Sequence, residues 1–97
     1  MSTGQPTPAE ERLARVLAVV CSIPAGEVMS YGEVARQAGL GQGARLVARV
    51  LCRLPDDTEV PWHRVINARG RVSLPADSDA GREQRRRLLV EGVVCRD

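Results

Sequence analysis

The sequence is poor in aromatic residues, and it contains no lysine. It has no phenylalanine, one tryptophan and one tyrosine, so its core has to be built from aliphatic side chains. Its three cysteines, Cys21, Cys52 and Cys95, are odd in number and widely spaced, which argues against a disulfide framework. Without a CxxC pair or a His/Cys cluster the sequence predicts no metal site, and it predicts no cofactor. We expect Cys21 and Cys52 to be small core residues, because both lie in apolar stretches.

Long hydrophobic runs are also missing. No stretch approaches the roughly 20 apolar residues that a membrane-spanning helix needs. The first eight residues are polar, which predicts neither a signal peptide nor a membrane anchor. With 43% hydrophobic residues in 97, the chain is expected to form one globular domain over residues 1–97, with residues 1–7 flexible. We therefore expect a soluble, cytoplasmic protein, nucleoid-associated if the host is bacterial.

The positive charge is unevenly distributed along the chain. All 14 basic residues are arginine, which is typical of a GC-rich genome, and the net charge is only +2. However, residues 34–55 hold four arginines and residues 60–76 hold three, and neither segment contains an acidic residue. Such a distribution favours one basic face.

The first predicted helix begins at Thr7-Pro8-Ala9-Glu10. Thr7 is placed as the N-cap, Pro8 suits the first helical position, and Glu10 stands where a capping box puts its acid. Pro24 and Gly26 end the helix. Apolar residues at helical spacing predict one buried stripe: Leu13, Val16, Leu17 and Val20.

Two further helices are predicted on either side of a glycine turn. Ser30 and Glu33 form a second capping box, and Gly39 stops that short helix. The next helix is expected from about residue 42 to residue 54. The predicted inner faces are Val34, Ala35 and Ala38 for one helix, and Ala44, Val47, Ala48 and Leu51 for the other. Three arginines at four-residue intervals share the outer face of the second helix: Arg45, Arg49 and Arg53. This pattern is typical of a helix-turn-helix, although an ordinary helical hairpin with a solvated arginine face has the same pattern.

The remainder of the chain predicts a small β wing and a last helix. Two short β-prone runs, Val65-Ile66 and Arg71-Val72-Ser73, flank Ala68-Arg69-Gly70. This pattern indicates a hairpin. Residues 81–90 return to helical spacing, with apolar contacts expected from Leu88, Leu89 and Val93. The predicted fold class is α+β and mostly helical: a winged-helix-like helix-turn-helix domain of three to four helices with a short β wing.

The most informative stretch is Pro61-Trp62-His63-Arg64-Val65. It contains the single tryptophan and the single histidine of the chain, side by side, after a proline and before the predicted wing. Taken alone, Trp62 could be a core anchor and His63 a hydrogen-bonded structural residue.

This stretch resembles the active site of O6-alkylguanine-DNA alkyltransferases, which is Pro-Cys-His-Arg-Val in the C-terminal domain. Tryptophan in place of the alkyl-accepting cysteine is typical of the alkyltransferase-like proteins. The resemblance extends from about Ile23 to Gly92 and includes Ser30-Tyr31-Gly32-Glu33, Ala44-Arg45-Leu46-Val47 and Leu88-Leu89-Val90-Glu91-Gly92. The steps of 14 residues from Tyr31 to Arg45 and 17 residues from Arg45 to Trp62 also fit the family.

The resemblance implies a role for individual residues. Tyr31 matches the tyrosine that crowds the phosphate beside the target and helps rotate the nucleotide out. Arg45 matches the arginine finger that fills the space left by the guanine, while Ala44 and Arg49 would lie along the minor groove. His63 and Glu91 match the hydrogen-bond relay that activates the thiol in true alkyltransferases, and here they would be a vestigial relay.

The resemblance also implies a pocket that binds the lesion and performs no chemistry on it. Alkyl transfer needs a thiolate, and the indole of Trp62 is a poor nucleophile at neutral pH. It can instead offer an aromatic surface to a flipped base. The predicted pocket residues are Tyr31, Pro61, Trp62, Val65, Ser73, Leu74 and Pro75.

Two positions depart from the family pattern. Leu54 stands where the family commonly has an asparagine that fixes the turn after the recognition helix. The loop Ser73-Leu74-Pro75-Ala76 lacks the tyrosine that covers the pocket in alkyltransferases, which predicts a roomier pocket that accepts larger alkyl groups.

The resulting hypothesis is non-enzymatic recognition of O6-alkylguanine in double-stranded DNA, by minor-groove docking and base flipping. By resemblance, the bound monomer marks lesions for nucleotide excision repair through damage-recognition proteins, and it competes with alkyltransferases. Two alternatives stay open at this point. One is a winged-helix transcriptional regulator that prefers an undamaged sequence, and the other is a residual enzyme that uses another nucleophile.

Overall fold

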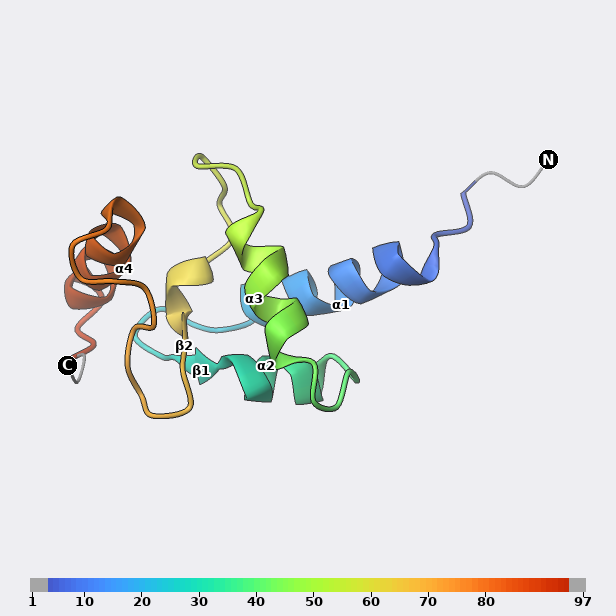
Figure 1. The fold of residues 1–97 in the computed structure, drawn as a ribbon, viewed down its shortest axis with the longest axis horizontal. Helices are drawn as coiled ribbons and strands as arrows, with labels where there is room; N and C mark the ends of the chain where they lie inside the picture. Colours follow the sequence, from blue (N-terminus) through green and yellow to red (C-terminus); the bar gives the residue numbers. More distant parts are fainter. Residues whose placement is uncertain (1–3, 95–97) are drawn as a thin grey trace.

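The computed structural model describes residues 4–94 of the chain (Figure 1). The elements in these residues are α1 (Pro8–Cys21), β1 (Met29–Ser30), α2 (Tyr31–Gln37), α3 (Ala44–Cys52), the 3-10 turn η1 (Trp62–Arg64), β2 (Val65–Ile66) and α4 (Asp79–Val90). In Figure 1, α1 and α4 lie at opposite ends, with α2, α3 and the two short strands between them. The mostly helical α+β fold class is thus confirmed.

Helix α1 begins at the predicted capping box. The Glu10 amide donates to the Thr7 hydroxyl at 3.1 Å, and the Thr7 amide donates to the Glu10 carboxylate at 2.8 Å. Thr7 is thereby fixed, whereas residues 1–3 of the segment predicted to be flexible lie outside the described residues. The apolar stripe is only partly buried: Val16 and Val20 are fully buried, but Leu13 is 42% exposed. The first turns of α1 extend beyond α2 and α3 in Figure 1, so they have little to pack against.

Helices α2 and α3 form the predicted helix-turn-helix. The Glu33 amide donates to the Ser30 hydroxyl at 3.1 Å, but the Glu33 carboxylate turns to Arg36 and Gln37, so only half of the second capping box forms. Gly39 ends α2 with φ at 77°, and the next amide, that of Leu40, donates to the Ala35 carbonyl at 2.8 Å. A left-handed residue followed by this bond is a Schellman motif, which is why glycine is suited to the position.

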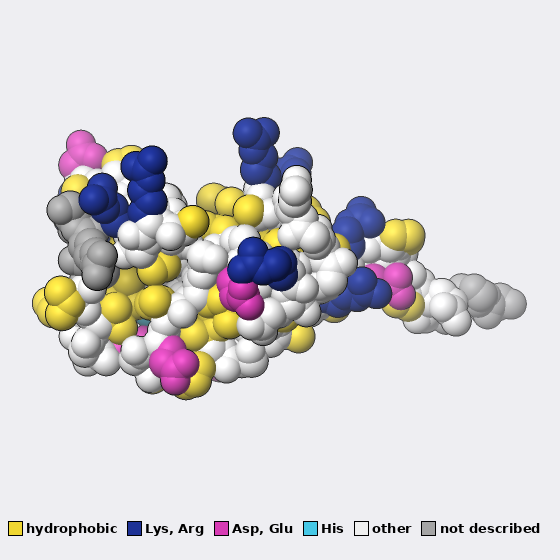
Figure 2. All heavy atoms as spheres, turned by 90° about the horizontal axis from the view of Figure 1, so that it is seen from below, with side chains coloured by type: hydrophobic (Ala, Val, Ile, Leu, Met, Phe, Trp, Pro, Cys, Tyr) yellow, Lys and Arg dark blue, Asp and Glu magenta, His cyan; other side chains and the backbone are white. Residues whose placement is uncertain are grey.

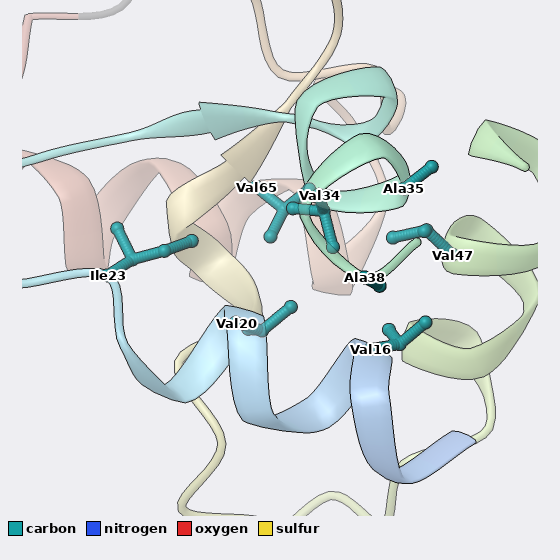
Figure 3. Packing of buried hydrophobic residues seen from close by; sticks show 8 residues of the cluster. All are labelled: Val16, Val20, Ile23, Val34, Ala35, Ala38, Val47 and Val65. Atoms are coloured by element: carbon teal, nitrogen blue, oxygen red, sulfur yellow. The ribbon is translucent and has the colours of Figure 1, made fainter. Parts of the chain in front are cut away.

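The core lies where α1, α2, α3 and β2 meet (Figure 3). It is made of short aliphatic side chains, as the lack of phenylalanine predicts: Val16, Val20, Ile23, Val34, Ala35, Ala38, Val47 and Val65. A second, smaller cluster of Ile66, Val72 and Leu88 packs under α4. Each Å² of apolar surface that these two clusters remove from water stabilises the fold by about 25 cal/mol.

The strand pairing differs from the predicted hairpin. Strand β2 pairs in parallel with β1, with Met29 opposite Val65 and Ser30 opposite Ile66. Residues 71–73 form no strand, although the Asn67 amide donates to the Arg71 carbonyl at 2.9 Å across the turn. The Asn67 side chain adds to this turn by accepting from the Arg69 amide at 2.9 Å and the Arg71 amide at 3.0 Å. The predicted turn thus forms, but the predicted strand at residues 71–73 does not, because the β-prone run 65–66 pairs with the segment before α2. This pairing ties the segment containing Trp62 to the start of the helix-turn-helix.

Helix α4 begins at Asp79, two residues earlier than expected, with the Ser78 hydroxyl accepting from the Gly81 amide at 3.0 Å. Leu88 is fully buried as predicted, whereas Leu89 is 72% exposed and supplies no core contact. The buried Gln84 side chain donates to the carbonyls of His63 at 3.2 Å and Val65 at 2.9 Å. A polar side chain therefore attaches α4 to η1 and β2. None of the helices in residues 4–94 has the length and apolar character needed to cross a membrane.

Candidate nucleic-acid interface

The 3-10 turn η1 buries the side chain of His63 and leaves that of Trp62 partly exposed. Pro61 precedes it, the Trp62 amide donates to the Val60 carbonyl at 2.7 Å, and the Arg64 amide donates to the Pro61 carbonyl at 3.0 Å. In this tight turn His63 is buried, with 7% of its surface exposed, while Trp62 is half-buried. The two rings stand edge to face, with centroids 6.3 Å apart. Trp62 is thus fixed in place and still accessible.

Trp62 lies in a cavity of about 610 Å³ between α3, η1 and α4. This size falls within the range of about 300–1,000 Å³ that is usual for small-molecule sites, so the cavity has room for a nucleobase. Its lining residues are Tyr31, Ala48, Leu51, Cys52, Leu54, Pro55, Asp56, Trp62, Leu74, Asp79, Ala80, Glu83, Gln84 and Arg87. Of the predicted pocket residues, Tyr31, Trp62 and Leu74 are therefore brought together.

The other four predicted pocket residues are not among those that line the cavity. Val65 is fully buried in the core, opposite Met29 of β1. Pro61 precedes η1, and the Pro75 carbonyl accepts from the Ser78 hydroxyl at 2.7 Å, ahead of α4. Ser73 lies at the edge, since its hydroxyl is 3.4 Å from the Tyr31 hydroxyl.

The prediction that Cys21 and Cys52 are core residues was wrong, since both are exposed. Both lie at the last position of their helix, α1 or α3, where the side chain extends past the packed turns. Cys52 moreover lines the Trp62 cavity instead of facing the core. Leu54 lines the same cavity, and its amide donates to the Leu51 carbonyl at 3.3 Å, which shapes the turn after α3 by backbone alone.

Sequence reasoning missed the contribution of α4 to the cavity. Five residues of this helix face it: Asp79, Ala80, Glu83, Gln84 and Arg87. Their spacing of three to four residues places them on one helical face, and this periodicity was the available signal. It was not recognised because a polar helical face is ordinarily solvated.

Arg87 stands over Trp62, with its guanidinium carbon 5.4 Å from the ring centroid. Its Nε donates to the Glu83 carboxylate at 2.6 Å, and Arg86 donates to the same carboxylate at 2.7 Å. The hydrogen bonds from Arg86 and then Arg87 lower the pKa of Glu83 to about 2. One face of the indole is therefore covered by a cation that an ionised carboxylate holds in position.

His63, Glu91 and Arg64 form a compact network behind Trp62. His63 Nε2 lies 2.9 Å from Glu91 Oε2, so the two predicted relay residues do meet. Arg64, which sequence reasoning did not single out, donates to Glu91 from Nε at 3.0 Å and from Nη2 at 2.6 Å, and from Nη1 to the Ile23 carbonyl at 2.8 Å. The Gly26 amide also donates to Glu91, at 3.3 Å.

The charge state of Glu91 is set by this network. The Arg64 hydrogen bonds lower its pKa most, His63 and the Gly26 amide lower it further, and partial burial opposes them, so the pKa falls to about 2. Glu91 is therefore ionised at neutral pH, and its carboxylate connects η1, the chain after α1 and the end of α4. His63 Nδ1 is buried without a hydrogen-bond partner among the described residues.

The outer face of α3 carries the predicted arginines. Arg45, Arg49 and Arg53 are all exposed, and within residues 4–94 none of them forms an ion pair. Arg45 is the second residue of α3, directly after Ala44, and no side chain caps the amides at that helix start. Figure 2 shows arginine side chains that project well beyond the surrounding surface along the upper edge of the view. Free arginines next to uncapped helical amides are a favourable arrangement for phosphate.

Comparison with known proteins places this geometry in a family. Residues 11–93 match the family described as 6-O-methylguanine DNA methyltransferase, DNA binding domain. Alkyltransferase-like protein 1 of Schizosaccharomyces pombe is 44% identical over 87% of this chain and 78% of its own length. The DNA base-flipping protein of Escherichia coli is 49% identical over 82% of this chain and 60% of its own length.

Solved structures give the same result. The crystal structure of the S. pombe protein in complex with damaged DNA containing O6-carboxymethylguanine matches with a TM-score of 0.80 and 44% identity, over 87% of this chain and 78% of that one. Among the described residues of the present chain, no group of three or more His, Cys, Asp or Glu residues is arranged to hold a metal ion. The chain belongs to the alkyltransferase-like members of the 6-O-methylguanine DNA methyltransferase DNA-binding domain family.

Proposed function

We propose that this protein binds duplex DNA carrying O6-alkylated guanine, rotates the damaged base into the Trp62 cavity and transfers no alkyl group. The observation that carries this proposal is the cavity itself: it presents an accessible indole beside a helix-turn-helix whose α3 carries unpaired arginines. The E. coli relative is named a base-flipping protein, and the S. pombe relative was crystallised on DNA containing an O6-alkylated guanine. Both names support the same function for this chain.

The residues of the helix-turn-helix would make the contacts to DNA. Extrusion of a base costs a few kcal/mol in lost stacking and pairing, and the protein has to offset this cost. In this proposal α3 lies in the minor groove with Ala44 and Arg49 along it, and Arg45 fills the space that the guanine leaves. A planar guanidinium suits this position because it stacks on bases and forms hydrogen bonds in one plane. Tyr31, at the start of α2 and at the cavity, crowds the adjacent phosphate.

The absence of alkyl transfer follows from the chemistry of Trp62. Transfer of an alkyl carbon needs a thiolate nucleophile, and an indole is not one. Base stacking on an aromatic ring contributes about 1–3 kcal/mol per base. In this proposal Trp62 therefore stabilises the rotated base at the position where alkyltransferases have their reactive cysteine. One observation keeps an enzymatic alternative in view, because the exposed Cys52 lines the same cavity.

The cellular role is proposed from the same resemblance. A protein that binds a lesion and leaves it unrepaired marks it for another pathway, so we propose that the complex recruits nucleotide excision repair damage-recognition proteins. The same binding would compete with alkyltransferases for their substrate. We further propose that the protein acts as a monomer in the cytoplasm, on the nucleoid in a bacterial host.

The test is a titration with two readouts. A duplex with one O6-methylguanine and its unmodified twin are each titrated with protein at one fixed salt concentration, because phosphate contacts make affinity strongly salt-dependent. The intact mass of the protein is measured afterwards. Tighter binding to the lesion with unchanged protein mass is expected.

Each other outcome has a defined meaning. Equal affinity for both duplexes would refute lesion recognition. A mass gain of one methyl group would show an enzyme, and its loss in Cys52→Ala would identify the acceptor.

A further inference from the structure

We propose that Arg87 reads the guanine ring inside the cavity, by donating hydrogen bonds from its two terminal nitrogens to the N7/O6 edge of the flipped base. This inference rests on the proposed function, since it needs a base in the Trp62 cavity. It adds a specificity-determining contact from α4, an element outside the helix-turn-helix.

The position of Arg87 meets the geometric requirement. It lines the cavity, and its guanidinium carbon lies 5.4 Å from the centroid of the Trp62 ring. A base held beside the indole, in the cavity that both residues line, would therefore lie within reach of the guanidinium. The Arg87 side chain is 30% exposed, so part of it stays accessible from the cavity.

The hydrogen bonds of Arg87 leave its terminal nitrogens available. Its Nε donates to Glu83 at 2.6 Å, and within residues 4–94 neither of its two Nη atoms is in a hydrogen bond. Glu83 and Trp62 thus fix the plane of the guanidinium before any ligand arrives. A prepositioned fork loses less side-chain entropy on binding than a free arginine does.

Guanine offers the matching acceptors. Its N7 and O6 lie on one edge and accept the paired donors of arginine, which is the commonest base-specific contact of proteins with DNA. Alkylation turns O6 into a weaker ether acceptor, but it leaves the lone pair of N7 intact. The N7 bond is therefore the part of the contact that survives in the lesion.

The other polar residues of the cavity do not supply a free pair of donors, since Tyr31 and Trp62 each carry a single one. Asp56, Asp79 and Glu83 carry carboxylates, which accept hydrogen bonds when ionised. The Gln84 amide nitrogen is engaged by two backbone carbonyls, at 3.2 and 2.9 Å. Among the residues that line the cavity, Arg87 thus has the free pair of donors that matches the N7/O6 edge, and a pyrimidine lesion such as O4-alkylthymine would lack N7.

The test removes the donor and the acceptor separately and together. Wild-type protein and Arg87→Ala are each titrated with duplexes that contain O6-methylguanine or O6-methyl-7-deazaguanine, in which carbon replaces N7. The wild type is expected to lose affinity about tenfold on the 7-deaza duplex, whereas Arg87→Ala binds both duplexes equally. An Arg87 that merely orients Trp62 would weaken binding to both duplexes by the same factor, and that result would overturn the inference.

Arg86→Ala is the matched control. Arg86 shares the Glu83 carboxylate, but it is 63% exposed and does not line the cavity. This variant should keep the tenfold preference for N7. Loss of the preference in Arg86→Ala, or its retention in Arg87→Ala, would contradict the assignment.

The proposed function and this inference fail in different ways. If the wild type binds the O6-methylguanine duplex no more tightly than plain guanine, lesion recognition is refuted and the inference falls with it. If the lesion is preferred but the 7-deaza substitution has no effect, recognition stands and the reading of the ring by Arg87 is refuted.

Discussion

Replacement of Glu91 by glutamine should destabilise the protein at neutral pH, and the effect should disappear in acid. Glutamine has the shape of a protonated glutamate and no charge. Glu91→Gln therefore removes at pH 7 the negative charge that the wild type loses only in acid. The carboxylate accepts hydrogen bonds from Arg64 and the Gly26 amide, and it lies 2.9 Å from His63 Nε2. Its side chain is only 16% exposed, so solvent screens these contacts weakly.

The magnitude follows from the pKa of Glu91. A fall from the ordinary value of 4.5 to about 2 corresponds to a preference for the charged form in the folded state of about 3 kcal/mol. Because the folded-state pKa is the lower one, this stabilisation is complete above pH 4.5. It declines as the pH falls below that value and is lost as the pH passes through about 2.

The assay is urea unfolding of the wild type and Glu91→Gln at pH 7, 5, 4 and 3. Other carboxylates with lowered pKa values, such as Glu83, titrate in both proteins and cancel in the difference. The free energy of unfolding should differ by about 3 kcal/mol at pH 7, and the two curves should converge below pH 4.5. A difference that is the same at every pH, or that is below about 0.5 kcal/mol at pH 7, would refute the reasoning.

Three further predictions concern the interface and the fold. Arg45→Ala should weaken binding to the O6-methylguanine duplex by about 1–3 kcal/mol in a titration at fixed salt, while Arg12→Ala, on α1 and outside the helix-turn-helix, should not. Equal affinity of Arg45→Ala and wild type would remove the finger assignment. Trp62→Cys should show no gain of methyl mass after incubation with that duplex, because the cavity has diverged around Leu54; efficient uptake would mean that the site is otherwise intact. Gly81→Ala should lower the free energy of unfolding by about 1–3 kcal/mol, and thermal unfolding identical to wild type would contradict this. The reason is that a Cβ at Gly81 would lie 2.1 Å from the Pro75 carbonyl oxygen, where nothing flexible can move aside.

The helix starts were predictable because their signals are local. Thr7 with Glu10 and Ser30 with Glu33 each specify an N-terminus within four residues, and both helices begin where predicted. Gly39 likewise stops α2 through its own backbone conformation. A short capping motif contains all the atoms that its hydrogen bonds need, so no distant residue has to be known.

Strand pairing and burial at helix ends were not predictable in this way. The run Val65–Ile66 is β-prone in either pairing, and its choice of Met29–Ser30 depends on how α2 packs against the core. Cys52 and Leu89 lie in apolar stretches but are exposed, because Cys52 lines the open Trp62 cavity and Leu89 lies on the outer face of α4. Periodicity tells which residues share a face, and only packing tells whether that face is covered.

For the candidate site, the sequence by itself determined the chemical types: an aromatic residue at the reactive position, a histidine beside it, and arginines on one face of a helix. These follow from residue identity and spacing within η1 and α3. The tertiary structure alone decided that α4 forms a wall of the cavity and that Arg87 covers Trp62. It also decided that Arg64 donates from both Nε and Nη2 to the Glu91 carboxylate. These contacts join residues 25 or more positions apart, from Trp62 to Arg87 and from Arg64 to Glu91. No local pattern specifies which side chains meet over such a separation, because that depends on the docking of whole helices.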